Sequence, residues 1–203
     1  MNPLLDFSGL PRFGDFDTAN VTPAVNVLLE ENRTLTARMA GPDVPPTWND
    51  FVEPLEDANE RLGRAWGQVG HLNAVMNSPE LREVYNANLA RITQYYTEIS
   101  QNQALYEKYK ALRQSAEFDT LSPAQRRIVE NELRDFRLGG AELSPADKAR
   151  YMAIRERQSQ LASRFSDNLL DATNDFAHYV PDETQLAGVP GDALEAAREA
   201  AKA

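Results

Sequence analysis

The segment PTWNDFVEPLEDANERLGRAWGQVGHLNAVMNSPELREVY, residues 46–85, carries a clear helical pattern. Its first apolar residues recur at intervals of three and four, which places them on one face of an α-helix. These residues are Phe51, Leu55, Ala58, Leu62, Trp66 and Val69. Thr47 can cap this helix, and Pro54 predicts a kink or a helix start nearby. Ser78 and Pro79 predict the start of a second helix. The segment therefore predicts two consecutive amphipathic helices.

Start and stop signals divide the rest of the chain into further helices. Thr-Pro or Ser-Pro marks starts at positions 22, 122 and 144, while Gly-Pro at 41–42 and Gly-Gly at 139–140 mark stops. A brief turn at 101–102 separates two more apolar stripes, the second of which ends near Ser115. Alternating apolar and polar residues, the sign of a strand, are nearly absent. We expect an all-α fold, an irregular antiparallel helical array of about seven helices, because the connections are short.

The organisation predicted from these signals has three parts. Residues 1–20 form an irregular arm, residues 21–180 a helical domain, and residues 181–203 a loop and a C-terminal helix. The arm contains too many apolar residues to remain free in solvent, so we expect it to pack along the helices. Its apolar residues are Leu4, Leu5, Phe7, Leu10, Phe13 and Phe16.

The longest helix is expected to start at Ser144 and to run for about 30 residues, because neither Gly nor Pro interrupts its pattern before Pro181. Such length suggests a spine or a coiled-coil-like contact, and we expect Phe165, like Trp66, to be buried. Residues 178–190 read as a loop that could include a short strand. Asp192 and Glu195 predict a capping box for the last helix. That helix has no stop signal, so the chain ends as though it were cut.

The amino-acid composition of the chain argues against some classes of binding partner. The formal net charge of −10 argues against nucleic acids and anionic membranes, both of which require a basic surface. The absence of cysteine excludes disulfides, a Cys-ligated zinc and a cysteine nucleophile. The N-terminus lacks the pattern of a signal peptide, and no apolar run is long enough to cross a membrane. We expect a cytoplasmic protein.

The two histidines are weak candidates for chemistry. His71 lies on the apolar stretch with no Glu or His at helical spacing, so we expect a structural role inside the helix packing. His178 follows Asp175 in a DxxH pair, but a stable metal site needs three or four ligands. We therefore assign no catalytic, cofactor-binding or metal-ligating residue to this chain.

Carboxylates and tyrosines offer two further candidates. A carboxylate cluster on one helical surface could hold an acid and base pair, but a solvated face with Glu60 bonded to Arg64 is the favoured interpretation. The cluster comprises Glu53, Glu56, Asp57 and Glu60. Glu130 and Arg134 predict a similar exposed pair.

The tyrosines could line a peptide groove, although their spacing favours the core or its edge. They are Tyr95, Tyr96, Tyr106 and Tyr109. The serines at 78, 122 and 144 are explained by helix capping.

Several long strings in series resemble one known family. Besides residues 46–86, the strings are NPLLDFSGLPRF, TLSPAQRRIVENELRDFRLGGAEL and RFSDNLLDATNDFAHYV followed by LAGVP. Together they resemble the N-terminal region of the thimet oligopeptidase family of zinc metallopeptidases, in the same order and over the whole chain. In that family the chemistry lies on an HExxH helix with a later Glu. This chain contains no HExxH motif.

The resemblance implies one wall of a deep channel that admits oligopeptides and excludes folded proteins. It also implies that zinc and the catalytic part belong to an intact parent, so that residues 1–203 alone are inactive. The partners implied are that catalytic part and oligopeptide substrates. Self-association through an exposed face is a further expectation. The alternative is a self-standing helical module that binds a partner protein along the groove of the long helix.

Overall fold

A computed structural model describes residues 2–202, and over this range the chain is all-α, as the sequence predicts. The seven expected helices are present, and a short additional helix, α5, lies between α4 and α6. The bounds are α1 (Val21–Ala40), α2 (Glu53–Val75), α3 (Pro79–Ser100), α4 (Gln103–Gln114), α5 (Ala116–Thr120), α6 (Pro123–Gly139), α7 (Pro145–Asp175) and α8 (Gly191–Ala200). With a single turn, α5 is too short to leave a periodic signal. The chain divides into two compact units after Ser163.

The predicted caps account for the helix starts. The Ser78 hydroxyl accepts a hydrogen bond from the backbone N–H of Leu81 at 3.2 Å. Ser122 and Gln125 form a complete capping box at the start of α6. Gly140, with φ of 94°, ends α6 in the left-handed region that glycine tolerates. These local bonds satisfy backbone groups that a helix end leaves without partners.

Pro54 coincides with a helix start, one of the two outcomes expected. A five-residue π-turn, η4 (Trp48–Val52), precedes α2, and Pro54 lies in the first turn of α2. The Thr47 carbonyl accepts hydrogen bonds from the N–H groups of both Phe51 and Val52. A regular helix here would press the proline ring against the carbonyl four residues earlier. The wider π-turn therefore suits this position.

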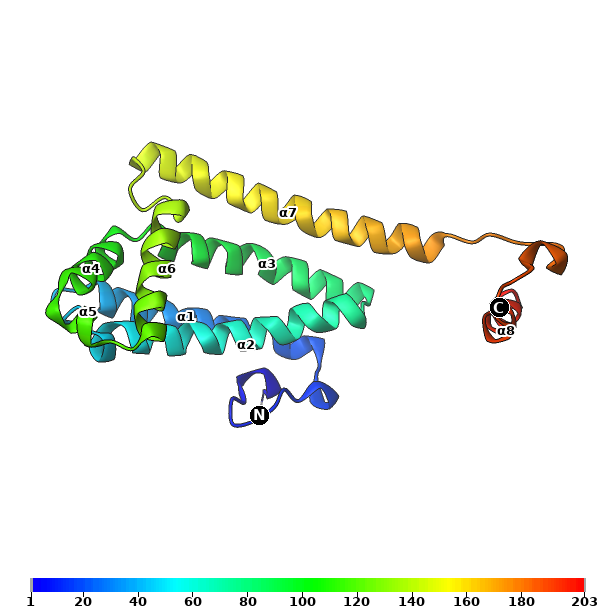
Figure 1. The fold of residues 1–203 in the computed structure, drawn as a ribbon, viewed down its shortest axis with the longest axis horizontal. Helices are drawn as coiled ribbons and strands as arrows, with labels where there is room; N and C mark the ends of the chain where they lie inside the picture. Colours follow the sequence, from blue (N-terminus) through cyan, green and yellow to red (C-terminus); the bar gives the residue numbers. More distant parts are fainter. Residues whose placement is uncertain (1, 203) are drawn as a thin grey trace. The chain divides into compact units, whose positions relative to one another are not determined.

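Two hydrophobic clusters form the core of the first unit. In one cluster α1, α2 and α3, which run side by side in Figure 1, pack with the N-terminal arm around Leu28, Leu62 and Tyr95. In the other cluster the end of α1 and η4 pack with α4, α5 and α6 around Phe51 and Phe136. Trp66 is partly buried at the edge of the first cluster and stacks on Tyr85, with ring centroids 4.9 Å apart. The predicted burial of Trp66 is therefore partial.

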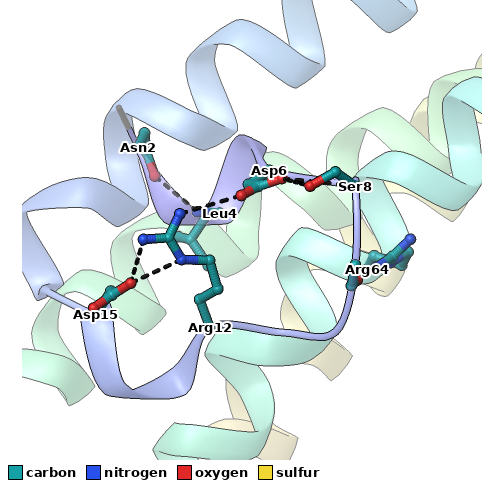
Figure 2. A network of polar contacts seen from close by, with 8 residues as sticks. Asn2, Leu4, Asp6, Ser8, Arg12, Asp15 and Arg64 are labelled. Carbon is teal, nitrogen blue, oxygen red and sulfur yellow. Dashed lines mark hydrogen bonds and ion pairs between the residues drawn. The ribbon is translucent and has the colours of Figure 1, made fainter.

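Polar contacts fasten the N-terminal arm, as Figure 2 shows. Arg12 bonds to both Asp6 and Asp15, which closes the arm on itself. The Arg64 guanidinium of α2 donates to the Gly9 carbonyl at 2.6 Å. Hydrogen bonds from Ser8 and Arg12 lower the pKa of Asp6 to about 2, so its carboxylate is ionised at neutral pH.

The apolar residues of the arm divide into two groups. Leu4 is buried, and Leu5, Phe7 and Phe16 pack against the first cluster, as expected. Leu10, in contrast, is 89% exposed, and Phe13 is 43% exposed. The expectation that all of them pack was wrong for Leu10, because residues 8–12 form an exposed loop that Arg64 ties to α2 at the Gly9 carbonyl, while the Leu10 side chain faces solvent.

Polar contacts hold α7 along α3 within the first unit. Lys148 donates to the Gln101 carbonyl at 2.9 Å, and Ser159 and Thr93 share a hydrogen bond of 3.0 Å. No residue of α7 is buried, and Phe165 is 70% exposed, so its predicted burial was wrong. The helical spacing of Phe165 fixes its direction around α7 but supplies no surface to cover it.

The second unit contains the end of α7, a 3₁₀ turn and α8. Residues 178–190 contain η5 (Glu183–Leu186) and no strand, which corrects the suggestion of a short strand. The capping box at Asp192 is also absent. The Pro190 carbonyl already accepts from the N–H of Leu194, so the helix begins before Asp192 can cap it. Across residues 2–202, no helix has both the length and the apolar character that crossing a membrane requires.

Candidate functional site

The histidines do not form a metal centre. His71 is exposed, and its ring lies 5.4 Å from that of Phe13, so its predicted place inside the helix packing was wrong. It lies two residues beyond buried Val69, about 200° around the helix. His178 is also exposed and belongs to the second unit. Nowhere in the described range do three His, Cys, Asp or Glu residues gather as metal ligands would.

The carboxylate cluster is a solvated face except at one position. Glu53, Asp57 and Glu60 are exposed, and Glu60 lies 3.7 Å from Arg64, as predicted. Glu56 instead is half-buried, and desolvation followed by the charge of Asp57 raises its pKa. The solvated-face prediction was therefore wrong for Glu56.

Glu132 is an ionisable residue that the sequence analysis missed. Burial, the charge of Glu56 and that of Asp135 raise the pKa of Glu132 to about 7. The signal was present in its spacing, because Glu132 comes three residues after buried Val129 and four before buried Phe136. Burial and these two glutamates also raise the pKa of Tyr109 well above its usual value. Tyr109 is a member of the second hydrophobic cluster, so its electrostatic coupling to Glu56 and Glu132 places both carboxylates near that cluster.

The expected Glu130–Arg134 pair does not form. Arg134 bonds instead to the neighbouring Asp135 at 2.8 Å, and Glu130 lies 3.9 Å from Arg113 of α4. Both arrangements are exposed and contribute little to stability.

The tyrosines belong to the core with one exception. Tyr95, Tyr106 and Tyr109 are at most 2% exposed, which confirms the core interpretation and excludes these three from a groove. Neighbouring side chains accept hydrogen bonds from two of these hydroxyls: Tyr106 donates to Glu142 at 2.8 Å, and Tyr95 donates to an Asn59 oxygen at 3.0 Å. Tyr96 is 41% exposed and contributes to a pocket.

That pocket has a volume of about 380 Å³ and lies between α3, α6 and α7 in the first unit. Its lining includes Tyr96 of α3, Asp135 and Leu138 of α6, and Tyr151 and Arg155 of α7. Its lining combines aromatic, apolar and charged side chains, and it is partly open to solvent. Sequence reasoning missed it because three separate helices contribute to it.

A second hollow lies on α7 alone. It is apolar, and Ile154 and Leu161, 55% and 47% exposed, line it together with Arg150 and Arg157. Large apolar side chains at helical spacing usually face a core. Here they face solvent, which makes this part of α7 a candidate interaction surface.

Comparison with known proteins places the chain in a family. The family described as Neurolysin/Thimet oligopeptidase, N-terminal domain, matches residues 25–148. The chain therefore belongs to the neurolysin/thimet oligopeptidase family, and the resemblance seen in its sequence is confirmed.

Three relatives illustrate the likeness. The chain is 44% identical to oligopeptidase A of Haemophilus influenzae over 99% of its own length and 29% of that protein. It is 41% identical to oligopeptidase A of Escherichia coli, over 100% of this chain and 30% of the relative. Dipeptidyl carboxypeptidase of Escherichia coli is 29% identical, over 100% of this chain and 30% of that protein. The chain thus spans less than a third of the length of these relatives.

Proposed function

We propose that this chain is the N-terminal helical domain of an oligopeptidase A-like zinc metalloendopeptidase. The observation that carries the proposal is the match over the whole chain to oligopeptidases A at 41–44% identity, of which it covers 29–30%. On this proposal, peptide hydrolysis and the zinc ion belong to the part of the parent that these 203 residues do not include. The parent acts on oligopeptides in the cytoplasm.

Within that parent the chain serves as a wall of the substrate channel. Two hydrophobic clusters and the polar contacts between α3 and α7 support this role, because a wall that selects by size must not deform. The net charge of −10 adds a long-range field that disfavours acidic peptides. Size selection by the wall and hydrolysis by the remaining part are separate tasks.

The organisation expected from the sequence remains part of this proposal. Residues 1–20 act as the arm, residues 21–180 as the helical domain, and residues 181–203 lead to the catalytic part. The exposed apolar residues of α7, Ile154 and Leu161, favour contact with another protein surface.

The same surface supports the alternative, a self-standing interaction module that binds a partner along α7. The genomic reading frame distinguishes the peptidase proposal from the interaction-module alternative. The peptidase proposal requires the frame to continue beyond residue 203 into an HExxH motif. A natural stop codon at that point would favour the module.

A chimera provides the biochemical test. This chain replaces the corresponding 29% of Haemophilus influenzae oligopeptidase A, and a quenched fluorescent peptide reports cleavage. The chimera should cleave the peptide but spare the same sequence placed inside a folded protein. Residues 1–203 alone, with added zinc, should cleave neither. A folded chimera that cuts both substrates would contradict the wall, and chelator-sensitive turnover by the chain alone would contradict the assignment of catalysis to the remaining part.

A further inference from the structure

The pocket between α3, α6 and α7 has a fixed frame. The Tyr151 hydroxyl donates to the Leu138 carbonyl at 3.2 Å and so joins α7 to the end of α6. Gly139 allows α6 to approach α3, because a Cβ at this position would lie 2.3 Å from the Cβ of Ser100. The hydrogen bond between Thr93 and Ser159 ties α3 to α7 beside the pocket. The cavity therefore exists before a ligand arrives.

The charges in the lining are not equivalent. The carboxylate of Asp135 is already engaged by Arg134, through contacts of 2.8 and 3.1 Å. Arg155 donates to the neutral amide oxygen of Gln158 at 3.1 Å. Among the residues that the structure describes, no carboxylate pairs with Arg155. Its guanidinium is free to bind a carboxylate through two parallel hydrogen bonds.

The remaining lining suits an aromatic or apolar group. Tyr96 and Tyr151 offer ring surfaces with polar tips, and Ile92 and Leu138 add apolar area. Partial burial raises the pKa of Tyr96 above an ordinary value that is already 10, and its hydroxyl is therefore protonated at neutral pH and can donate a hydrogen bond. The volume of about 380 Å³ is near the lower end of the roughly 300–1,000 Å³ of typical ligand pockets, which limits the ligand to about one or two amino acids.

We propose that this pocket binds the C-terminal aromatic residue of a short peptide, with Arg155 holding the terminal carboxylate and Tyr96 and Tyr151 contacting the side chain. The proposal does not depend on the channel-wall function, because it concerns a site formed by this chain alone. Binding here requires no metal and no residue of another chain.

Isothermal titration calorimetry on the 203-residue chain tests this site. The probe is N-acetyl-phenylalanine, and its matched control is N-acetyl-phenylalanine amide, which has the same ring but no carboxylate. The acid should bind saturably, and the amide at least tenfold more weakly. Arg155→Gln should reduce the affinity for the acid by a similar factor. Arg157→Gln, which removes an equal charge from the same helix outside this pocket, should leave the affinity unchanged.

Arg155 is exposed, so its replacement should not disturb folding, which circular dichroism verifies. No saturation by the acid in the millimolar range would overturn the proposal. Equal affinity for the acid and the amide would do the same, because the carboxylate would then not be recognised. Equal losses in Arg155→Gln and Arg157→Gln would show an effect of general charge and would also refute the site.

Discussion

Lys108 holds the end of α1 from a neighbouring helix. Its ammonium lies 2.6, 2.5 and 2.7 Å from the carbonyl oxygens of Met39, Gly41 and Val44. The last carbonyls of a helix have no partner within it, so this single side chain from α4 satisfies groups that would otherwise need water. It also fixes the turn that leads from α1 toward η4.

Replacing Lys108 by Met should therefore destabilise the fold. Hydrogen bonds to a charged group contribute about 1.5–3 kcal/mol, so we expect a loss in that range by urea denaturation. Lys110→Met is the matched control, because the Lys110 ammonium pairs with the exposed Glu107 at 3.1 Å and lies 5.0 Å from the centre of the Tyr106 ring, so its loss should cost no more than about 1 kcal/mol. Equal unfolding midpoints for the two variants would show that the three carbonyl contacts contribute nothing.

Glu132 should make stability depend on pH. Its pKa is about 7 in the folded state, against 4.5 for an ordinary Glu. Below pH 4.5 the carboxyl is protonated in both states and has no effect. Between pH 4.5 and 7 the unfolded chain loses the proton while the folded chain keeps it, so stability falls as pH rises. Above pH 7 the carboxyl is ionised in both states, and the unfolding free energy is lowered by the full cost of keeping its charge partly buried.

Glu132→Gln should reduce the difference in unfolding free energy between pH 5 and pH 8 by about 1–3 kcal/mol, a range lowered for partial contact with water. Thermal and urea unfolding at both pH values measure it. The control is Glu130→Gln, an exposed residue two positions away that should leave the difference nearly unchanged. If both variants behave alike, the effect reflects the net charge of the whole protein.

At the scale of helices, α6 and α7 have similar apolar stripes, but a phenylalanine of the first is buried and one of the second is exposed. Phe136 of α6 is 2% exposed and contacts the rings of Tyr106 and Tyr109. Phe165 of α7 is 70% exposed. The spacing of apolar residues is helical in both segments, so periodicity alone does not distinguish them.

Phe136→Ala should cost about 3–5 kcal/mol because it leaves a cavity in the second hydrophobic cluster. Phe165→Ala should change stability by less than about 0.5 kcal/mol, as exposed substitutions usually do. Chemical denaturation of the two variants compares them directly. A cost for Phe165 as large as that for Phe136 would mean that α7 is covered by another surface in solution.

For the whole molecule, the apolar hollow on α7 predicts self-association at high concentration. Ile154 and Leu161 are exposed at helical spacing, and apolar patches of this kind tend to find a partner. Sedimentation velocity should show species that grow with concentration, and Leu161→Glu should reduce them. Val75→Glu, at a residue 62% exposed at the end of α2, serves as a control. A strictly monomeric profile at high concentration would contradict this prediction.

The sequence by itself determined seven of the eight described helices, most of their boundaries and the family. Caps such as Ser122 with Gln125, and the stop at Gly140, depend on residues within a few positions of one another, so local spacing suffices to predict them. The stripes around Leu62 and Val129 follow from the 3.6-residue period in the same way.

Only the tertiary structure decided which stripes are covered and which polar groups meet. The solvent exposure of Phe165, the partial burial of Glu132 and the convergence of Tyr96 with Arg155 each depend on where another helix lies. A helical period fixes the direction of a side chain around its own axis, but burial and pKa depend on atoms contributed by residues distant in sequence.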